Sequence, residues 1–321
     1  MGNVLISFAI FFGIAFSLIV VDGKPKQDAL EQNQLSFDEL AIDYSDIPRL
    51  DTFLCKDETY LDYRYYQSES DNVIILLHGS GWHSRYFLPL AEYLSNQNLA
   101  HVYTPDLRGH GMDPAKRGDI DYIKQYDDDL ADLIKLIKTK HPNSKLILGG
   151  HSSGGGLAVR FASSKYGDQV DAFLLLTPYL KYNAPTIRPQ SGGWASVHLP
   201  RIVGLSMLNS VFIRTFNYLP VIDFNMPKPY RDGTETLTYS YRLNTAYAPR
   251  NYKKSFKSMH QKALLVVGSA DESFVPEMFE PAVSKYKKDI EVKIINDVTH
   301  MGLVIGEEIR PILKEWINGL K

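Results

Sequence analysis

The chain has 321 residues, of which 44% are hydrophobic and 22% are charged, and its formal net charge is −2. This length can bury one sizeable core with an inserted subdomain, and the near-neutral charge argues against a nucleic-acid-binding protein. A single cysteine, Cys55, excludes an internal disulfide and a cysteine-based metal site.

The N-terminus differs in composition from the rest of the chain. Residues 4–21 carry no charge and are almost wholly apolar, which is near the lower limit of roughly 17–25 residues for a membrane-spanning helix. No Lys or Arg precedes them, although export signals usually begin with basic residues. We predict an export signal or an uncleaved membrane anchor over residues 1–23, so the protein would be secreted or membrane-anchored. Residues 24–50, rich in Gln, Asp and Glu, are predicted to tether this segment to a folded domain over 51–321.

From residue 51 onward, short apolar runs alternate with helical patterns. Strands are predicted at 60–66, 73–77, 100–104, 146–148, 172–176, 263–267 and 292–295. Helical patterns occur at 86–94, 130–137, 309–317 and after Gly154. This alternation predicts an α/β fold with a mostly parallel central sheet and helices on both of its faces.

A long interval, residues 178–262, interrupts the alternation and is rich in proline, tyrosine and phenylalanine. A loop of this length without its own structure is uncommon in a compact domain, so we predict an inserted cap over about 180–258. Its apolar stretch from Trp194 to Leu208 contains Pro200 and Gly204. We predict that this stretch is too broken for one long helix and that it lines a channel for an acyl chain.

The strand predicted at 146–148 leads into Gly150-His151-Ser152-Ser153-Gly154. A phosphate-binding loop would need a lysine after the glycines, and a dinucleotide fingerprint would need G-x-G-x-x-G. The pattern G-x-S-x-G between a strand and a helix is instead typical of a nucleophile elbow, a strained turn that exposes a serine.

A nucleophilic serine needs an imidazole to take its proton and a carboxylate to orient that imidazole. Asp271 follows the strand predicted at 263–267, and His300 lies on the loop after 292–295. The chain order Ser, Asp, His is the order of the α/β-hydrolase fold. Asp297 is a rival for the carboxylate, whereas the adjacent Glu272 is expected to point elsewhere.

Five motifs, in order along the chain, resemble one family. They are His78-Gly79-Ser80-Gly81 followed by Trp82-His83-Ser84, Pro105-Asp106-Leu107-Arg108-Gly109-His110-Gly111, Gly150-His151-Ser152-Ser153-Gly154, Gly268-Ser269-Ala270-Asp271, and Val298-Thr299-His300. From about Phe53 to the C-terminus the chain resembles α/β-hydrolases of the monoacylglycerol lipase and lysophospholipase type. One departure is Ser153, which stands where these lipases usually carry methionine.

The resemblance implies Ser152 as nucleophile, Asp271 as orienting acid and His300 as general base. It also implies that the backbone N–H groups of Ser80 and Ser153 form the oxyanion hole, with no cofactor and no metal.

We therefore predict a serine esterase that cleaves carboxylic esters through an acyl-enzyme, with lipid-like acyl esters such as monoacylglycerols or lysophospholipids as substrates. A peptidase or amidase on the same fold is the alternative within enzymes, and a catalytically inert interaction module is the alternative outside them. Serine at position 152 disfavours an aspartate-nucleophile dehalogenase or epoxide hydrolase. The sequence assigns no oligomeric state.

Overall fold

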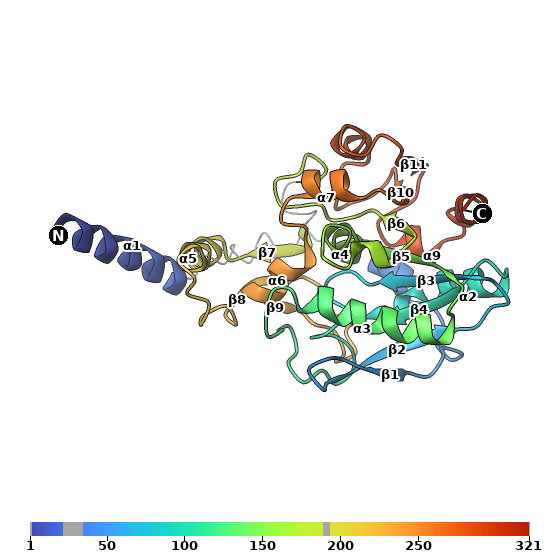
Figure 1. The fold of residues 1–321 in the computed structure, drawn as a ribbon, viewed down its shortest axis with the longest axis horizontal. Helices are drawn as coiled ribbons and strands as arrows, with labels where there is room; N and C mark the ends of the chain where they lie inside the picture. Colours follow the sequence, from blue (N-terminus) through green and yellow to red (C-terminus); the bar gives the residue numbers. More distant parts are fainter. Residues whose placement is uncertain (1, 22–34, 189–192, 321) are drawn as a thin grey trace.

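The computed structural model describes residues 2–21, 35–188 and 193–320. Its centre is an eight-stranded sheet with the strand order β1-β2-β4-β3-β5-β6-β10-β11 (Figure 1). The strands are β1 (Asp51–Leu54), β2 (Tyr60–Tyr66), β3 (Asn72–Leu77), β4 (His101–Pro105), β5 (Lys145–His151), β6 (Ala172–Leu176), β10 (Lys262–Gly268) and β11 (Glu291–Ile295). Only the β1–β2 and β2–β4 pairs of this sheet are antiparallel. The predicted α/β fold with a mostly parallel sheet is confirmed.

Helices cover both faces of the sheet, which explains why its central strands are continuous apolar runs. In β3, Val73, Ile75 and Leu77 belong to one buried cluster and Ile74 and Leu76 to a second one. The first cluster includes side chains of α3 (Gln125–Lys140), α4 (Ser153–Phe161) and α8 (Phe279–Val283). The second includes side chains of α2 (Leu88–Asn96), α9 (Gly302–Ile305) and α10 (Arg310–Asn318). Short 3-10 helices complete the fold: η2 (Phe37–Leu40), η3 (Ser84–Phe87), η4 (Gly167–Gln169), η6 (Lys228–Tyr230) and η7 (Pro276–Met278).

A second, antiparallel sheet lies between β6 and β10 in the chain. It contains β7 (Ala195–Val197), β8 (Pro220–Phe224) and β9 (Thr238–Ser240). Three helices accompany it, α5 (Leu199–Ser210), α6 (Tyr241–Tyr247) and α7 (Tyr252–Ser258). These elements occupy the part of the chain in which we predict the cap.

The apolar stretch from Trp194 to Leu208 is not one helix, because residues 195–197 form β7. The expectation that Pro200 and Gly204 interrupt it is wrong, since residues 199–210 form a single α-helix of 12 residues, α5. Pro200 lies in its first turn, where a missing N–H group removes no intrahelical hydrogen bond. Gly204 lies within the helix, at the point where another helix crosses it closely.

That other helix is α1 (Gly2–Val20), which extends away from the central sheet beside α5 (Figure 1). Ala15 and Ile19 of α1 are buried. A Cβ atom on Gly204 would lie 2.6 Å from the carbonyl oxygen of Ala15 and 2.8 Å from Cγ1 of Ile19. The absence of a side chain at Gly204 therefore sets how closely the two helices approach.

The predicted signal or anchor, residues 1–23, is described from residue 2 to residue 21. Within the described parts of the chain, no helix has the length and apolar character needed to cross a membrane. The predicted tether, residues 24–50, is described from Leu35 onward. This portion packs against the domain, since Phe37 and Leu40 of η2 are each only 4% exposed.

We predict that Gly204→Leu separates α1 from α5 without unfolding the hydrolase domain. Leucine is a better helix former than glycine, so α5 itself persists, but its side chain would occupy the place of the α1 backbone. Deuterium uptake by the α1 amides should rise while uptake by the strands of the large sheet stays unchanged. Gly13→Leu is the matched control, because nothing lies within 4 Å of a Cβ atom there. Equal uptake in the two variants would contradict this role of Gly204.

Candidate active site

The turn between β5 and α4 holds Ser152 in a strained conformation. Its φ is +55° and its ψ is −119°, a region that costs a non-glycine residue on the order of 1–3 kcal/mol and that is typical of functional sites. The flanking glycines allow the turn: a Cβ on Gly150 would lie 2.3 Å from the Gly154 carbonyl oxygen, and a Cβ on Gly154 only 2.0 Å from that of Leu77. The Ser152 amide donates to the carbonyl of Leu176 at 2.9 Å, which ties the turn to β6.

Asp271 and His300 meet at the carboxyl ends of β10 and β11. Nδ1 of His300 lies 2.9 Å from Oδ2 of Asp271, and both residues are buried. The same Oδ2 accepts a hydrogen bond of 2.6 Å from the Thr177 hydroxyl. Oδ1 accepts from the amides of Ser273 and Phe274, at 2.9 and 2.8 Å. Four hydrogen bonds therefore fix the carboxylate that orients the imidazole.

The charges of this pair stabilise each other. Burial alone would lower the pKa of His300, but the charge of Asp271 and its hydrogen bond, with Glu272 and Glu39 farther away, raise that pKa above its ordinary value. Burial alone would likewise raise the pKa of Asp271, yet His300 and the hydroxyl of Thr177 lower it. The pair favours an ionised aspartate beside a histidine that readily accepts a proton.

The rival carboxylate, Asp297, is exposed and its backbone amide donates to the Ser269 hydroxyl. No ion pair or hydrogen bond joins Asp297 to His300 in the described structure. Glu272 does not contact the His300 imidazole in the described structure, as expected. Its Oε2 instead accepts from the backbone N–H of His300 at 2.8 Å, so it holds the histidine loop through the main chain.

The two predicted oxyanion donors lie on either side of the elbow. Ser153 is the first residue of α4, where an N–H group has no intrahelical acceptor and the helix dipole favours an anion. Ser80 follows β3, and its neighbours Gly79 and Gly81 donate their amides to the hydroxyls of Tyr86 (2.6 Å) and Tyr239 (2.9 Å). The Ser80 amide itself donates to no other described residue, so it is available to a substrate.

Three histidines near the elbow act as uncharged ties between loops. His78 Nε2 accepts from the Leu107 amide at 3.0 Å, and His151 Nε2 donates to the carbonyl of His300 at 3.0 Å. Burial lowers the pKa of His78 to about 4 and holds those of His110 and His151 well below the ordinary value.

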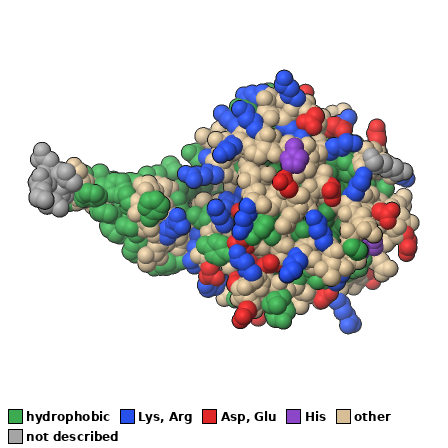
Figure 2. Space-filling model, viewed as in Figure 1, with side chains coloured by type: hydrophobic (Ala, Val, Ile, Leu, Met, Phe, Trp, Pro, Cys, Tyr) green, Lys and Arg blue, Asp and Glu red, His purple; other side chains and the backbone are tan. Residues whose placement is uncertain are grey.

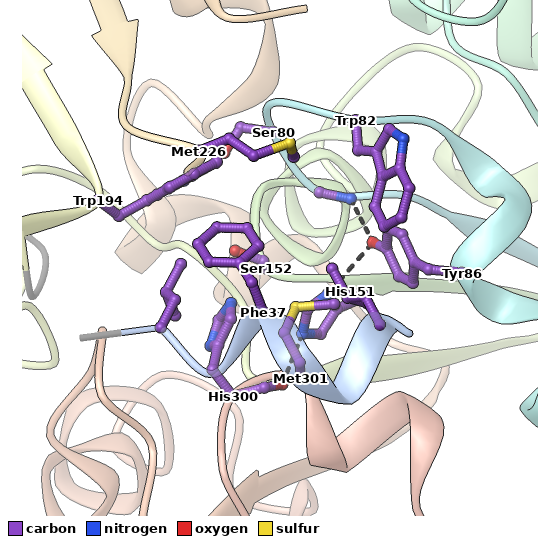
Figure 3. Close-up of a pocket in the computed structure, with 13 residues that line it drawn as sticks. Phe37, Ser80, Trp82, Tyr86, His151, Ser152, Trp194, Met226, His300 and Met301 are labelled. Atoms are coloured by element: carbon purple, nitrogen blue, oxygen red, sulfur yellow. Dashed lines mark hydrogen bonds between the residues drawn. The ribbon is translucent and has the colours of Figure 1, made fainter. Parts of the chain in front are cut away.

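A pocket lies over Ser152, and its walls are mainly apolar and aromatic (Figure 3). The residues that line it are Leu35, Phe37, Leu40, Gly79, Ser80, Trp82, Tyr86, His151, Ser152, Trp194, Met226, His300 and Met301. Among these described residues, none carries a carboxylate, an ammonium or a guanidinium group. The pocket thus combines Ser152 and His300 with a surface suited to an apolar group.

The prediction that residues 194–208 line an acyl channel is mostly wrong, because only Trp194 of this stretch contributes to the pocket. Leu205 and Leu208 are buried within the core instead. Leu35, Phe37 and Leu40, which do contribute, were missed because they stand in a polar segment without strand or helix periodicity.

We predict that His300 titrates above its ordinary pKa in the intact protein and below it in Asp271→Asn. The replacement removes the negative charge that favours the imidazolium, and burial then dominates and disfavours it. At a given pH near neutrality, the protonated fraction of His300 should therefore be smaller in Asp271→Asn than in the intact protein. NMR of ring-labelled histidine measures this, with His300→Gln to assign the signal. Asp297→Asn is the control and should leave the titration of His300 unchanged. A larger drop in the His300 pKa in Asp297→Asn than in Asp271→Asn would show that Asp297 is the partner.

Comparison with known proteins agrees with this arrangement. Residues 68–307 match the family described as serine aminopeptidase, S33. The chain is 26% identical over 236 residues to the monoglyceride lipase of Homo sapiens, covering 72% of this chain and 75% of that protein. It is 29% identical over 106 residues to the monoacylglycerol lipase of Mycolicibacterium smegmatis, covering 33% of this chain and 37% of that protein.

Two solved structures share the fold. The monoacylglycerol lipase of Paleococcus ferrophilus superposes with a TM-score of 0.63 at 20% identity, over 81% of this chain and 99% of that one. A soluble variant of the monoglyceride lipase of Saccharomyces cerevisiae superposes with a TM-score of 0.68 at 16% identity, over 88% of this chain and 98% of that one. The resemblance to monoacylglycerol lipases is confirmed, and since the matched residues 68–307 include Ser152, Asp271 and His300, the chain belongs to the serine aminopeptidase S33 family of α/β-hydrolase enzymes.

Proposed function

We propose that this protein hydrolyses carboxylic esters of lipid-like acyl groups, such as monoacylglycerols or lysophospholipids, with Ser152, Asp271 and His300 as its catalytic triad. The observation that carries the proposal is the bond of 2.9 Å between His300 and Asp271 beside the strained Ser152, in one apolar pocket. Its similarity to monoglyceride lipases supports the choice of substrate.

The geometry supports an acyl-enzyme mechanism. Because Nδ1 of His300 bonds to Asp271, Nε2 is the nitrogen that takes the proton of the Ser152 hydroxyl as its oxygen attacks the ester carbonyl. The amides of Ser80 and Ser153 then stabilise the negative oxygen of the tetrahedral intermediate. The imidazolium gives its proton to the leaving alcohol, which leaves an acyl group on Ser152. Water, deprotonated by His300, releases the acid and restores the serine.

The pocket walls favour an acyl chain over a peptide. An aminopeptidase, as the family description names it, must hold the ammonium group of a free N-terminus, and a carboxylate in the pocket would do so best. The described lining offers none, whereas Phe37, Trp82, Trp194 and Met226 present apolar surface. An inert interaction module would not require the strain at Ser152.

We predict that turnover efficiency rises from acetyl toward medium-chain or long-chain esters. Each methylene buried against the pocket contributes about 0.8 kcal/mol, so several would outweigh a single polar contact. The measurement is kcat/KM over a series of acyl esters, together with labelling by a fluorophosphonate probe. Ser152→Ala should lose both turnover and labelling while remaining folded. A preference for acetyl esters would exclude the lipid-ester substrate, and turnover by the folded Ser152→Ala protein would exclude the mechanism.

We further propose that α1 attaches the protein to a membrane, as an uncleaved anchor that lies in the interface. The side chains of Ile6, Phe8, Ile10, Ile14 and Phe16 are 43–59% exposed. Figure 2 shows the resulting apolar projection from a body whose surface carries scattered charged side chains. Such a surface is stable in water only when covered, and the boundary of a bilayer covers it.

The neighbouring segment of the cap has a composition that fits this orientation. Leu199 and Val203 of α5 are also exposed, at 62% and 42%. Residues 193–219 contain Arg201 and Arg214 but no Asp or Glu. Basic residues beside an apolar helix favour anionic lipid headgroups.

We predict that the full chain floats with vesicles of phosphatidylcholine and phosphatidylglycerol, whereas a chain beginning at Gln27 does not. The shorter chain keeps the hydrolase domain, so it should hydrolyse soluble esters at the rate of the full chain. Ile10→Asp, on the open face of α1, should weaken flotation severalfold. Tyr60→Asp is the control, since Tyr60 is 63% exposed on β2. Flotation of the shorter chain equal to that of the full chain would contradict attachment through α1.

A further inference from the structure

Residues 35–40, named here the N-terminal strap, lie across the pocket although they are remote in sequence from the rest of its lining. They supply Leu35, Phe37 and Leu40 of the 13 lining residues. Figure 3 shows the ring of Phe37 in the pocket between the elbow and the cap residue Trp194. Phe37 is 4% exposed, and its ring centre lies 5.3 Å from that of Trp194. The strap therefore forms a wall of the substrate pocket.

Hydrogen bonds hold the strap against the loop that carries the catalytic histidine. Oε1 of Glu272 accepts from the Ser36 amide (3.1 Å) and hydroxyl (2.8 Å), while its Oε2 accepts from the His300 amide (2.8 Å). In parallel, Glu39 accepts from the Thr299 hydroxyl at 2.8 and 2.7 Å. One carboxylate from each side thus fastens the strap and the histidine loop together.

Aromatic contacts fix the Phe37 ring within this frame. Besides Trp194, the ring stacks on Tyr230 of η6 at 5.7 Å between ring centres and 28° between planes. Trp194 in turn stacks on Phe224 of β8, and its Nε1 donates to the Ser80 hydroxyl at 3.3 Å. The ring is therefore held between the histidine loop and the cap, and it cannot move aside without breaking these contacts.

We infer that Phe37 is a specificity-determining residue that limits the length of the acyl chain the pocket accepts. This inference rests on the proposed ester hydrolysis and adds a boundary to its substrate class. A fixed aromatic ring blocks the space behind it, so a chain that reaches the ring gains nothing from further methylenes. Removal of the ring leaves its volume to the acyl chain, in a pocket whose lining includes the apolar side chains of Leu35, Leu40 and Met301. Each methylene that fills this volume should improve transition-state binding about fourfold.

The test compares Phe37→Ala with Phe53→Ala in the full chain. Phe53 lies on β1, is only 5% exposed and does not line the pocket. Its replacement by alanine therefore removes the same buried ring as Phe37→Ala but at a position outside the pocket. In the intact protein, kcat/KM over esters from acetyl to palmitoyl should reach a plateau. In Phe37→Ala the plateau should move several methylenes longer, with the ratio of long-chain to short-chain efficiency rising at least tenfold. Phe53→Ala should keep the original ratio.

A second variant separates the anchor of the strap from the ring. Ser36→Ala removes the hydrogen bond from the Ser36 hydroxyl to Glu272. It leaves in place the hydrogen bond from the His300 amide to Glu272. It should shift the preference in the same direction as Phe37→Ala and by a smaller factor. Unchanged preference in both folded variants would overturn the inference.

A binding measurement keeps this inference distinguishable from the proposed function. Saturated fatty acids of increasing length are titrated into Ser152→Ala and into the double variant with Phe37→Ala, with tryptophan fluorescence as the signal, since Trp82 and Trp194 line the pocket. If the double variant binds longer fatty acids best, Phe37 limits the chain length. This result would support the inference even if the protein hydrolysed no ester, because the absence of hydrolysis would contradict only the proposed function. The same optimum in both would overturn the inference even if esters are hydrolysed.

Discussion

The backbone contact between α4 and the end of β3 is the constraint on which the site depends. A Cβ atom on Gly154 would lie only 2.0 Å from the carbonyl oxygen of Leu77, so no side chain fits at this position. This approach brings the start of α4, with the Ser153 amide, next to the loop that carries the Ser80 amide. In the same turn, Ser152 has a φ of +55°. The strained elbow and the two predicted oxyanion donors therefore lie at one close backbone contact.

The strands were predictable because their chemistry is repetitive. Each of the seven predicted strands is present in the structure. The central strands β3, β5, β6 and β10 are buried parallel strands, which read as continuous apolar runs. The elbow and the downstream positions of Asp271 and His300 were predictable because the fold fixes their order and their place after strands. The place of Asp271 directly after a strand favoured it over Asp297, but the sequence could not show which carboxylate contacts His300. The structure does, through the hydrogen bond that Asp271 makes to Nδ1 of His300.

The errors in the cap and the N-terminal region also have physical reasons. β7 and β9 have three residues each, too few for a periodicity to appear. Pro200 and Gly204 suggest a break in α5, but Pro200 lies in the first turn, and Gly204 lies where α1 crosses the helix closely. The apolar side chain of Phe37 is surrounded in sequence by Ser36, Asp38 and Glu39, so local composition indicates a solvated tether. Its burial is visible only once Trp194 and Tyr230 are brought to it.

Two polar residues of the strap, Ser36 and Glu39, explain how this short segment is held over the pocket. Burial disfavours the charge of Glu39 and raises its pKa, an effect that the Thr299 hydroxyl opposes and that the charge of Glu272 adds to. Two carboxylates near one another would repel, so each needs its own donors, and the strap and the histidine loop supply them.

Their combined negative charge has a second consequence. Together with Asp271, Glu272 and Glu39 raise the pKa of His300 and so favour its protonated form. An imidazolium forms when the histidine takes the proton of a serine, and fixed negative charge around it stabilises that state. The strap therefore lines the pocket with Phe37 and contributes through Glu39 to the electrostatic field at His300. Pocket shape and proton affinity are coupled in one short segment of the chain.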